Sequence, residues 1–141
     1  SFLEVAARAA TAALVAEGRS VDWEVLVTRS EDLAQGPRRA SWDVVTVRAV
    51  GTMTQVAELG VPLLGDRGLL VCWKREGTGG SLGQELDAAR DHIADLGGAE
   101  PEVHPVPLAG LEDHRLVLVR RARPTPRRYP RTPAERRRLL R

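Results

Sequence analysis

Two apolar runs in the sequence are each followed at once by a cationic side chain: Arg48 comes after residues 44–47, and Lys74 comes after residues 69–73. In open α/β sheets, ligands bind just beyond the carboxyl ends of the strands. A cation there can form charge-assisted hydrogen bonds with a phosphate group, and an arginine can form two in parallel. We therefore expect Arg48 and Lys74 to face a phosphate. The competing interpretation is that each is a strand-end charge paired with a neighbouring acid.

The end of the chain holds a second group of residues suited to phosphate. Residues 120–141 contain ten arginines against one acid, Glu135, whereas the first 119 residues contain 11 basic and 18 acidic side chains. A segment this basic predicts a polyanionic partner. The ring of Tyr129 could stack on an unpaired base. Four prolines, at positions 124, 126, 130 and 133, would stiffen the segment into an extended arm, and the alternative is a disordered, solvated tail.

Composition narrows the classes of protein to consider. A chain of 141 residues is long enough for one domain with a hydrophobic core. No apolar run approaches the roughly 20 residues of a membrane span. The single cysteine, Cys72, cannot form an internal disulfide, and we expect a small core residue in a reducing, cytoplasmic compartment. The three histidines lack metal-ligand spacing and are expected on the surface, and residues 77–80 lack the Lys-Ser/Thr of a phosphate-binding loop.

Hydrophobic periodicity predicts the elements of the first half of the chain. Residues 2–17 carry apolar side chains at helical spacing, and Gly18 provides a stop. Residues 21–27 alternate between apolar and polar, which is typical of a half-exposed strand towards a sheet edge. Residues 42–49 contain four consecutive β-branched side chains. This pattern is typical of a strand covered on both faces, at the centre of a parallel sheet rather than at its edge.

The second half of the chain predicts a mainly parallel sheet that ends in a hairpin. A helix begins at residues 51–52 and is ended or distorted by Pro62, and an interior strand follows at residues 69–73. Ser81 and Gln84 match a capping box that opens a helix running to residues 97–98. Prolines confine residues 102–108 to an edge strand, and residues 116–119 form an interior strand antiparallel to it. The predicted class is α/β, in the order α-β-β-α-β-α-β-β.

The residues at the end of the chain carry a family resemblance. Residues 123–131 read R-P-T-P-R-R-Y-P-R, which resembles the T-P-x-[RK]-Y-P-R signature of the small-subunit ribosomal RNA guanine-N7 methyltransferases, also called glucose-inhibited division protein B or RsmG. The agreement runs in order through nearly the whole chain. The other matching segments are F-L at residues 2–3, R-S-E at 29–31 where the family has R-A-E, D-V-V-T-V-R-A at 43–49, a strand ending in Lys74, E-L at 85–86 and L-G-G at 96–98.

The resemblance implies the C-terminal part of a Rossmann-like, S-adenosylmethionine-dependent methyltransferase sheet, in which the final hairpin inserts its last strand beside the interior. It divides the chain into a partial methyltransferase domain, residues 1–119, and a basic Arg/Pro-rich tail, residues 120–141. The family's glycine-rich D-x-G-[ST]-G-x-G-x-P-G segment is expected ahead of residue 1, so the chain is expected to be N-terminally truncated and inactive alone. The implied activity is methylation of guanine N7 in 16S ribosomal RNA of the small ribosomal subunit.

The resemblance and the strand-end positions together assign site residues. No acid–base pair is needed, because N7 of guanine has a free lone pair and positioning could carry the rate. The alternative for residues 29–32 is a solvated polar loop. The residues expected at the cofactor, near its adenine, are Arg29, Ser30, Glu31, Asp32 and Arg48. The residues expected to contact RNA are Arg48, Lys74, Arg123, Thr125, Arg127, Arg128, Tyr129 and Arg131.

Two other classes of function stay open. The chain could be a non-catalytic RNA- or ribosome-binding module that uses the same tail without cofactor chemistry. It could also be a structural α/β fragment whose basic tail only confers solubility.

Overall fold

The computed structural model describes residues 2–48, 50–77 and 81–138. The glycine-rich residues 78–80 and the last residue of the expected strand 42–49 lie outside the described residues. In chain order the elements are α1 (Phe2–Ala16), α2 (Ser30–Gln35), β1 (Trp42–Arg48), α3 (Met53–Gly60), the short 3-10 helix η1 (Val61–Leu63), β2 (Leu64–Arg75), α4 (Leu82–Asp95), β3 (Glu102–Pro105), β4 (His114–Arg120) and α5 (Pro133–Arg138).

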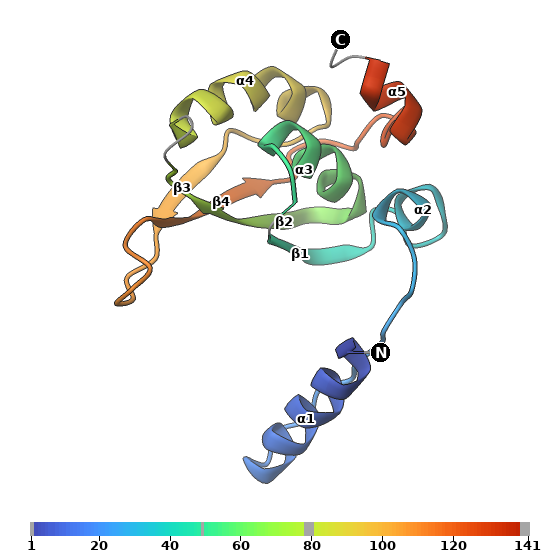
Figure 1. Ribbon diagram of the computed structural model, residues 1–141. Helices are drawn as coiled ribbons and strands as arrows, with labels where there is room; N and C mark the ends of the chain where they lie inside the picture. The colour runs from blue at the N-terminus through green and yellow to red at the C-terminus, as the bar shows by residue number, and fades with distance from the viewer. Residues whose placement is uncertain (1, 49, 78–80, 139–141) are drawn as a thin grey trace.

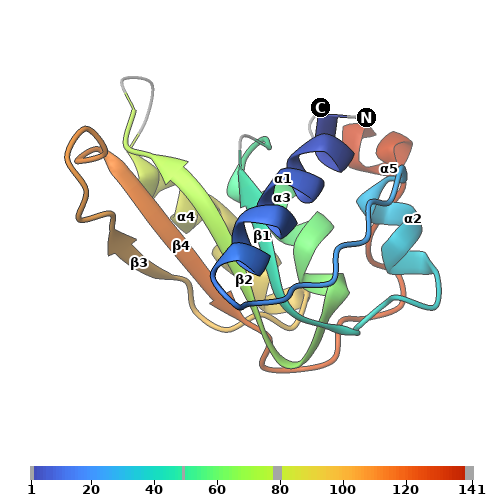
Figure 2. The same ribbon diagram turned by 90° about the horizontal axis from the view of Figure 1, so that it is seen from below.

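The strands form one mixed sheet in the order β1-β2-β4-β3 (Figure 2). β1 and β2 are parallel, and β4 is antiparallel to both β2 and β3. The last strand of the chain is therefore inserted between β2 and the edge strand β3. This confirms the predicted α/β class, the interior positions of β2 and β4, and the final antiparallel hairpin of a Rossmann-like methyltransferase sheet.

Helices α3 and α4 lie on the same side of the sheet, and the core is between them and the strands (Figure 1). Leu70 and Cys72 of β2 and Val117 of β4 point into this layer and are at most 1% exposed. They meet Met53 of α3 and Ile93 of α4, which are equally buried. Because alternate strand residues point to opposite faces, the neighbours of these core residues point away from the helices and are only partly buried.

β1 is the edge strand of the described sheet, so the prediction that it lies at the centre and is covered on both faces is wrong. Val44 is 53% exposed, and Val45 and Val47 are only partly buried against the core. The reason is that β1 pairs with β2 alone among the described strands, and that helices cover the sheet on one side. A run of β-branched residues favours an extended, packed strand, but it does not determine how many neighbouring strands pair with it.

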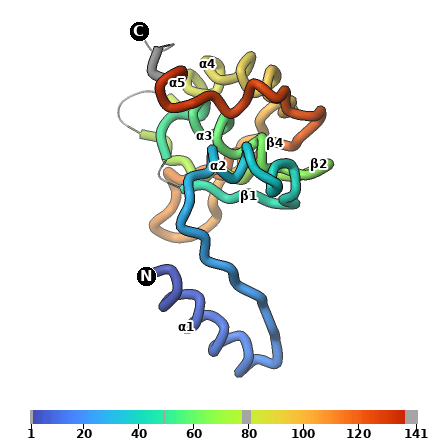
Figure 3. The backbone as a smooth tube through the Cα atoms, turned by 90° about the vertical axis from the view of Figure 1, so that its right-hand side faces the viewer, coloured from blue at the N-terminus to red at the C-terminus, as the bar shows by residue number. Residues whose placement is uncertain are grey.

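The prediction of a strand at residues 21–27 is also wrong. These residues are an extended connection, in which Trp23 is 54% exposed and Val27 is 96% exposed. A strand requires a partner for its backbone hydrogen bonds, and no strand in the described ranges pairs with this segment. The predicted first helix is confirmed as α1, which buries none of its residues and lies apart from the sheet (Figures 1 and 3).

The predicted helix starts are confirmed. Thr52 accepts a hydrogen bond from the Gln55 backbone N–H, and the Gln55 side chain accepts one from Thr52, so α3 opens with a full capping box. Ser81 caps α4 by accepting from the Gln84 N–H. The periodicity does not predict α2 and α5, because each has only six residues and is too short to show a repeat.

Gly97 joins the sheet to the tail. β4 continues through Arg120, and the chain then passes the end of α4, where the Gly97 carbonyl accepts from the N–H groups of Ala122 and Arg123 at 2.8 and 3.0 Å. Gly97 has φ +90°, and a methyl group on its Cα would collide with the Arg123 carbonyl oxygen. The crossing therefore requires glycine. The division of the chain into units 1–119 and 120–141 stays a prediction.

We predict that Gly97→Ala lowers the free energy of unfolding by at least about 2 kcal/mol, since the new methyl group meets backbone atoms in a left-handed conformation. Gly110→Ala is the matched control. Gly110 also has positive φ, but a methyl group added to its Cα would have no other atom within 4 Å. That control should cost only about 1 kcal/mol. Urea denaturation measures the stability of both variants. Equal losses would show that the chain does not require glycine at position 97, where the tail passes the end of α4.

Candidate functional site

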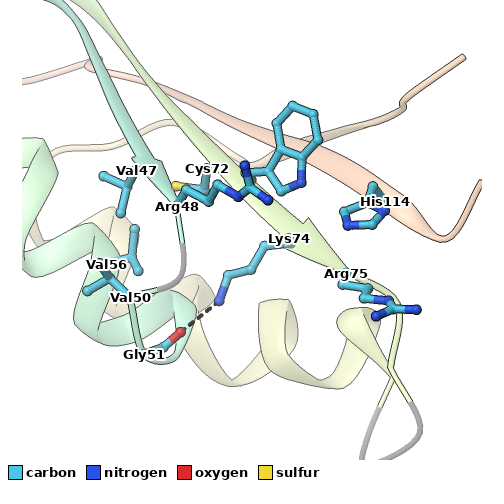
Figure 4. Close-up of a pocket in the computed structure, with 10 residues that line it drawn as sticks. Val47, Arg48, Val50, Gly51, Val56, Cys72, Lys74, Arg75 and His114 are labelled. Carbon is cyan, nitrogen blue, oxygen red and sulfur yellow. Dashed lines mark hydrogen bonds between the residues drawn. The ribbon is translucent and has the colours of Figure 1, made fainter. Parts of the chain in front are cut away.

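A pocket of about 290 Å³ opens at the carboxyl ends of the parallel strands β1 and β2 (Figure 4). We call it the strand-end pocket. It holds both cations that the sequence places at strand ends, so their predicted location is confirmed. The residues that line it are Val47, Arg48, Val50, Gly51, Val56, Cys72, Trp73, Lys74, Arg75 and His114.

Arg48 lies over an aromatic surface in this pocket. Arg48 of β1 and Trp73 of β2 are register partners, and the guanidinium carbon is 5.6 Å from the centre of the indole ring. The Trp73 ring also packs at a tilt against His114 of β4, with ring centres 5.7 Å apart. Arg48 has no carboxylate partner among the residues the structure describes. Its charge therefore stays available to an anionic ligand.

Two buried polar atoms at the strand-end pocket have no hydrogen-bond partner among the described residues. They are the indole Nε1 of Trp73 and the imidazole Nδ1 of His114. The latter lies 3.2 Å from an Asp113 carboxylate oxygen, but without the alignment of a hydrogen bond. Since an unpaired buried donor is costly, these atoms indicate a place where a polar ligand would improve the local hydrogen bonding.

Lys74 is paired with an acid, which is the alternative that the sequence analysis gives for a cation at the end of a strand. Its Nζ donates to Glu85 Oε1 at 2.6 Å and to the Gly51 carbonyl at 2.9 Å, and its side chain is 13% exposed. The same Glu85 oxygen accepts from the backbone N–H of Met53. Lys74 thus ties the start of α3 to α4, and of the two strand-end cations only Arg48 is left unpaired. The predicted contact of Lys74 with RNA stays a prediction.

Cys72 is a core residue, as expected. Its side chain is 1% exposed, and burial raises the pKa of the thiol to about 12. A thiol with this pKa is neutral near pH 7 and is not a nucleophile.

Residues 29–32 do not follow a strand; they open helix α2. Glu31 is buried and receives hydrogen bonds from Arg29 and from Arg136 of the tail. Burial by itself would raise the pKa of Glu31, but the hydrogen bonds from Arg136, from its own backbone and from Arg29 outweigh it and lower the pKa to about 2. None of residues 29–32 lines the strand-end pocket. The assignment of Arg29, Ser30, Glu31 and Asp32 to a cofactor stays a prediction.

The tail folds back onto the helices, so the expectation of an extended arm is wrong. The backbone N–H of Arg131 donates to Glu58 Oε1 at 2.8 Å, and its guanidinium donates to both oxygens of that carboxylate. Glu58, on α3, is 1% exposed, and His92 Nε2 of α4 lies 3.0 Å from it. Burial acts to raise the pKa of Glu58, but the hydrogen bonds and charge of Arg131 lower it below the ordinary value.

Tyr129 is part of the core and is 6% exposed. Its ring meets His92 edge-on, with centres 5.4 Å apart, and the guanidinium groups of Arg128 and Arg131 lie over it at 4.8 and 5.4 Å. The prediction that this ring stacks on an RNA base does not fit its position, because both the ring and the charge of Arg131 are used to dock the tail. His92 is likewise half-buried and not the ordinary surface group expected.

Arg39 holds the tail in place, and the sequence analysis misses it. Its guanidinium donates to the carbonyl oxygens of Ala34, Thr125, Pro126 and Tyr129 and so joins α2 to the tail. Glu58, Trp73 and His114 are missed as well. A weak signal exists for Glu58, which is the one acid of α3 and directly follows Val56 and Ala57 of its buried face. For Arg39, in a loop of charged and small residues, no local pattern distinguishes it.

Comparison with known proteins finds relatives that match most of this chain. The chain is 38% identical over 133 residues to the ribosomal RNA small subunit methyltransferase G of Symbiobacterium thermophilum, covering 92% of this chain and 51% of that protein. The protein of the same name from Deinococcus radiodurans is 40% identical over 107 residues, 74% of this chain and 41% of its own length. Over the part that it spans, the chain is similar to the ribosomal RNA small subunit methyltransferase G proteins.

The chain spans about half the length of the curated family members it matches. No protein-family model matches the chain. A solved structure of the CurJ carbon methyltransferase aligns with 74% of this chain and 34% of its own chain, at 16% identity and a TM-score of 0.45, which is too distant to support an argument.

The described residues include no group of three or more His, Cys, Asp or Glu side chains placed to hold a metal ion. None of the described helices is both long enough and apolar enough to cross a membrane.

We predict that Glu58→Gln lowers the free energy of unfolding by about 3 kcal/mol. That is the lower end of the cost of breaking a buried ion pair, because the Arg131 side chain keeps 24% of its exposure. Glu24→Gln removes the acid of an exposed pair with Arg38 and should change stability little. Chemical denaturation compares the two variants. A loss for Glu58→Gln no larger than that for Glu24→Gln would contradict a docking role.

Acid should weaken the contact between α2 and the tail. The pKa of Glu31 is depressed in the folded chain, so its stabilisation is complete above the ordinary value of 4.5 and is lost as the pH falls towards about 2. We expect Glu31→Gln to be less stable than the unsubstituted chain at pH 6 and the two to converge near pH 2. Urea titrations across this range measure the difference, and a pH-independent gap would contradict the ion-pair account.

Proposed function

We propose that this chain is part of an enzyme that methylates N7 of a guanine in 16S ribosomal RNA with S-adenosylmethionine as the methyl donor. The observation that carries the proposal is the identity of 36–40% with curated ribosomal RNA small subunit methyltransferase G proteins over most of the chain. The strand-end pocket supports it, because its free cation and aromatic wall suit a nucleotide. The proposed partner is the small ribosomal subunit, which implies a cytoplasmic location.

The residues of the strand-end pocket would position the nucleotide. Arg48 would neutralise a phosphate, and the buried Trp73 Nε1 and His114 Nδ1 would supply polar contacts. Lys74, which lines the pocket, is paired with Glu85 and is therefore not free to accept a proton. N7 has a free lone pair and loses no proton on methylation, so orientation next to the methyl donor and exclusion of water would supply the rate.

The described residues do not build a complete cofactor site. Glu31, which the sequence analysis assigns to the adenine, already accepts from two arginines. No glycine-rich turn that could approach the methionine moiety follows a strand in the described ranges. We therefore expect that cofactor binding needs the part of the family members that this chain does not span, and that this chain alone does not transfer a methyl group.

The sheet supports this division of the protein. β1 presents an unpaired edge, and Val44 on its outward face is 53% exposed. Residues 21–27 have strand-like alternation without a partner strand. Both features would be explained by further strands and helices from the rest of the protein, which would pair with β1 and cover the open face. In that arrangement β1 would become the interior strand that its composition indicates.

The exposed arginines of the tail would contribute to RNA binding. Arg123, Arg127 and Arg128 are exposed, whereas Arg131 and Tyr129 are used for docking. A docked tail would hold these arginines at fixed places against phosphates, as a rigid surface rather than a flexible arm.

The second candidate is an RNA- or ribosome-binding module without cofactor chemistry. The observation in its favour is that the basic tail is docked onto the helices, whereas the described residues do not build a complete cofactor site. The two candidates differ in whether S-adenosylmethionine binds once the remaining part of the protein is present.

Calorimetry with S-adenosylmethionine tests the proposal. The two proteins are this chain and a chimaera that adds the part of the Symbiobacterium thermophilum relative that this chain does not span. We expect binding by the chimaera only, and methyl transfer to 16S RNA that Arg48→Gln reduces by at least about tenfold, for the loss of one charged hydrogen bond. Arg90→Gln, on the exposed face of α4, is the matched control. Absence of cofactor binding by a folded chimaera would contradict the enzyme and favour the binding module.

A further inference from the structure

A second pocket, of about 700 Å³, lies between helix α2 and the tail. We call it the tail pocket. Arg39 comes just before β1, and Arg121 comes just after β4, which runs antiparallel to β2. The tail pocket is therefore at the opposite end of the sheet from the strand-end pocket, about 20 Å away along a seven-residue strand. The residues that line it are Ala34, Gln35, Gly36, Arg39, Arg121, Pro124, Thr125, Pro126 and Arg127.

The charge of the tail pocket is one-sided. Three arginines, Arg39, Arg121 and Arg127, line it, and no acidic residue does. None of the three forms an ion pair with a carboxylate in the part of the chain that the structure describes. Two other arginines near the tail are matched by acids: Arg136 by Glu31 and Arg131 by Glu58. The three unpaired cations repel one another, and only an added anion would compensate them.

The guanidinium nitrogens that have no acceptor indicate the kind of anion that the pocket would bind. Arg39 uses both terminal nitrogens on backbone carbonyls, so it contributes charge more than hydrogen bonds. Arg121 donates through Nε and Nη1 to the carbonyls of Arg123 and Leu64, which fixes its guanidinium. Its Nη2 and all the nitrogens of Arg127 donate to nothing among the described residues. Two guanidinium groups with free nitrogens on one pocket match the several oxygens of a phosphate group.

Two observations strengthen this assignment. The hydroxyl Oγ1 of Thr125, a residue of the pocket wall, is buried and has no hydrogen-bond partner in the described ranges. Burial, and then the charges of Arg121 and Arg127, lower the pKa of Arg39, in line with the three cations that line the pocket. The volume exceeds that of a phosphate group and leaves room for the sugar and base attached to it.

We propose that the tail pocket binds the phosphate of a nucleotide through Arg39, Arg121 and Arg127. The nucleotide is either part of an RNA strand or free. The RNA source rests on the proposed function, because an RNA held at the strand-end pocket would then have a second anchor at the other end of the sheet. The phosphate chemistry does not depend on that function.

Calorimetry on the full chain, with two probes, tests the proposal. The probes are inorganic pyrophosphate and a single-stranded RNA of about 12 nucleotides. Arg127→Gln removes a pocket cation that is exposed and has no internal hydrogen bond, so the variant should fold. Arg120→Gln is the matched control, because Arg120 is exposed, adjoins Arg121 in the chain and does not line the pocket.

We expect Arg127→Gln to weaken pyrophosphate binding by at least about tenfold, the loss of one charge-assisted hydrogen bond. Arg120→Gln should bind pyrophosphate as the unsubstituted chain does. If RNA is the source, Arg127→Gln should also weaken RNA binding. The slope of the logarithm of the RNA-binding constant against the logarithm of salt concentration should then become shallower by about one.

A loss confined to pyrophosphate would uphold the phosphate site and assign it to a free nucleotide. Pyrophosphate binding that is absent, or that is equal in Arg127→Gln and Arg120→Gln, would overturn the proposal. Neither result bears on cofactor binding by the chimaera, so failure here is distinguishable from failure of the proposed enzyme.

Discussion

The position of the tail depends on one buried ion pair. Glu58 is enclosed by α3, α4 and the tail, and such a carboxylate is tolerated only because Arg131 supplies hydrogen bonds to both of its oxygens. This pair holds Tyr129 against His92 and thereby sets the chain direction of the whole segment. The carbonyls that Arg39 binds, and the arginines that line the tail pocket, take their places from this docking. The tail is basic for two separate reasons: some arginines hold it in place, and the others remain exposed.

The one-sided sheet explains the distribution of the candidate sites. α3 and α4 cover one face, so the apolar residues that point to them make the core, while Arg48 and Trp73 point to the opposite face. The strand-end pocket combines residues from both faces, because Lys74 points towards the helices and is held by Glu85. Two anion-attracting pockets thus lie at opposite ends of the same strands. A polymer of phosphates is the kind of ligand that could contact both.

Local patterns predicted the elements well and the long-range contacts poorly. The capping residues Thr52 and Ser81 marked their helices correctly, because a cap is decided within four residues. The run at residues 42–49 is a strand over its described part, Trp42–Arg48, but its place at the edge depends on which other strands are present. Arg48 was found from its position after an apolar run. Arg39, Glu58 and His114 were not, because their roles come from partners 34 to 90 residues away in the chain or from a register between strands.

The most direct test of the central claim is to identify which residues touch the guanine. The protein is the chimaera that adds the part of the Symbiobacterium thermophilum relative that this chain does not span. A 16S RNA fragment that carries photoreactive thioguanosine at the methylated position is cross-linked to it, and mass spectrometry identifies the attached peptide. The structure predicts cross-links to peptides that contain Arg48 or Trp73, at the ends of β1 and β2. Cross-links confined to the tail would contradict this account, because the chain would then hold RNA without presenting a base to the strand-end pocket.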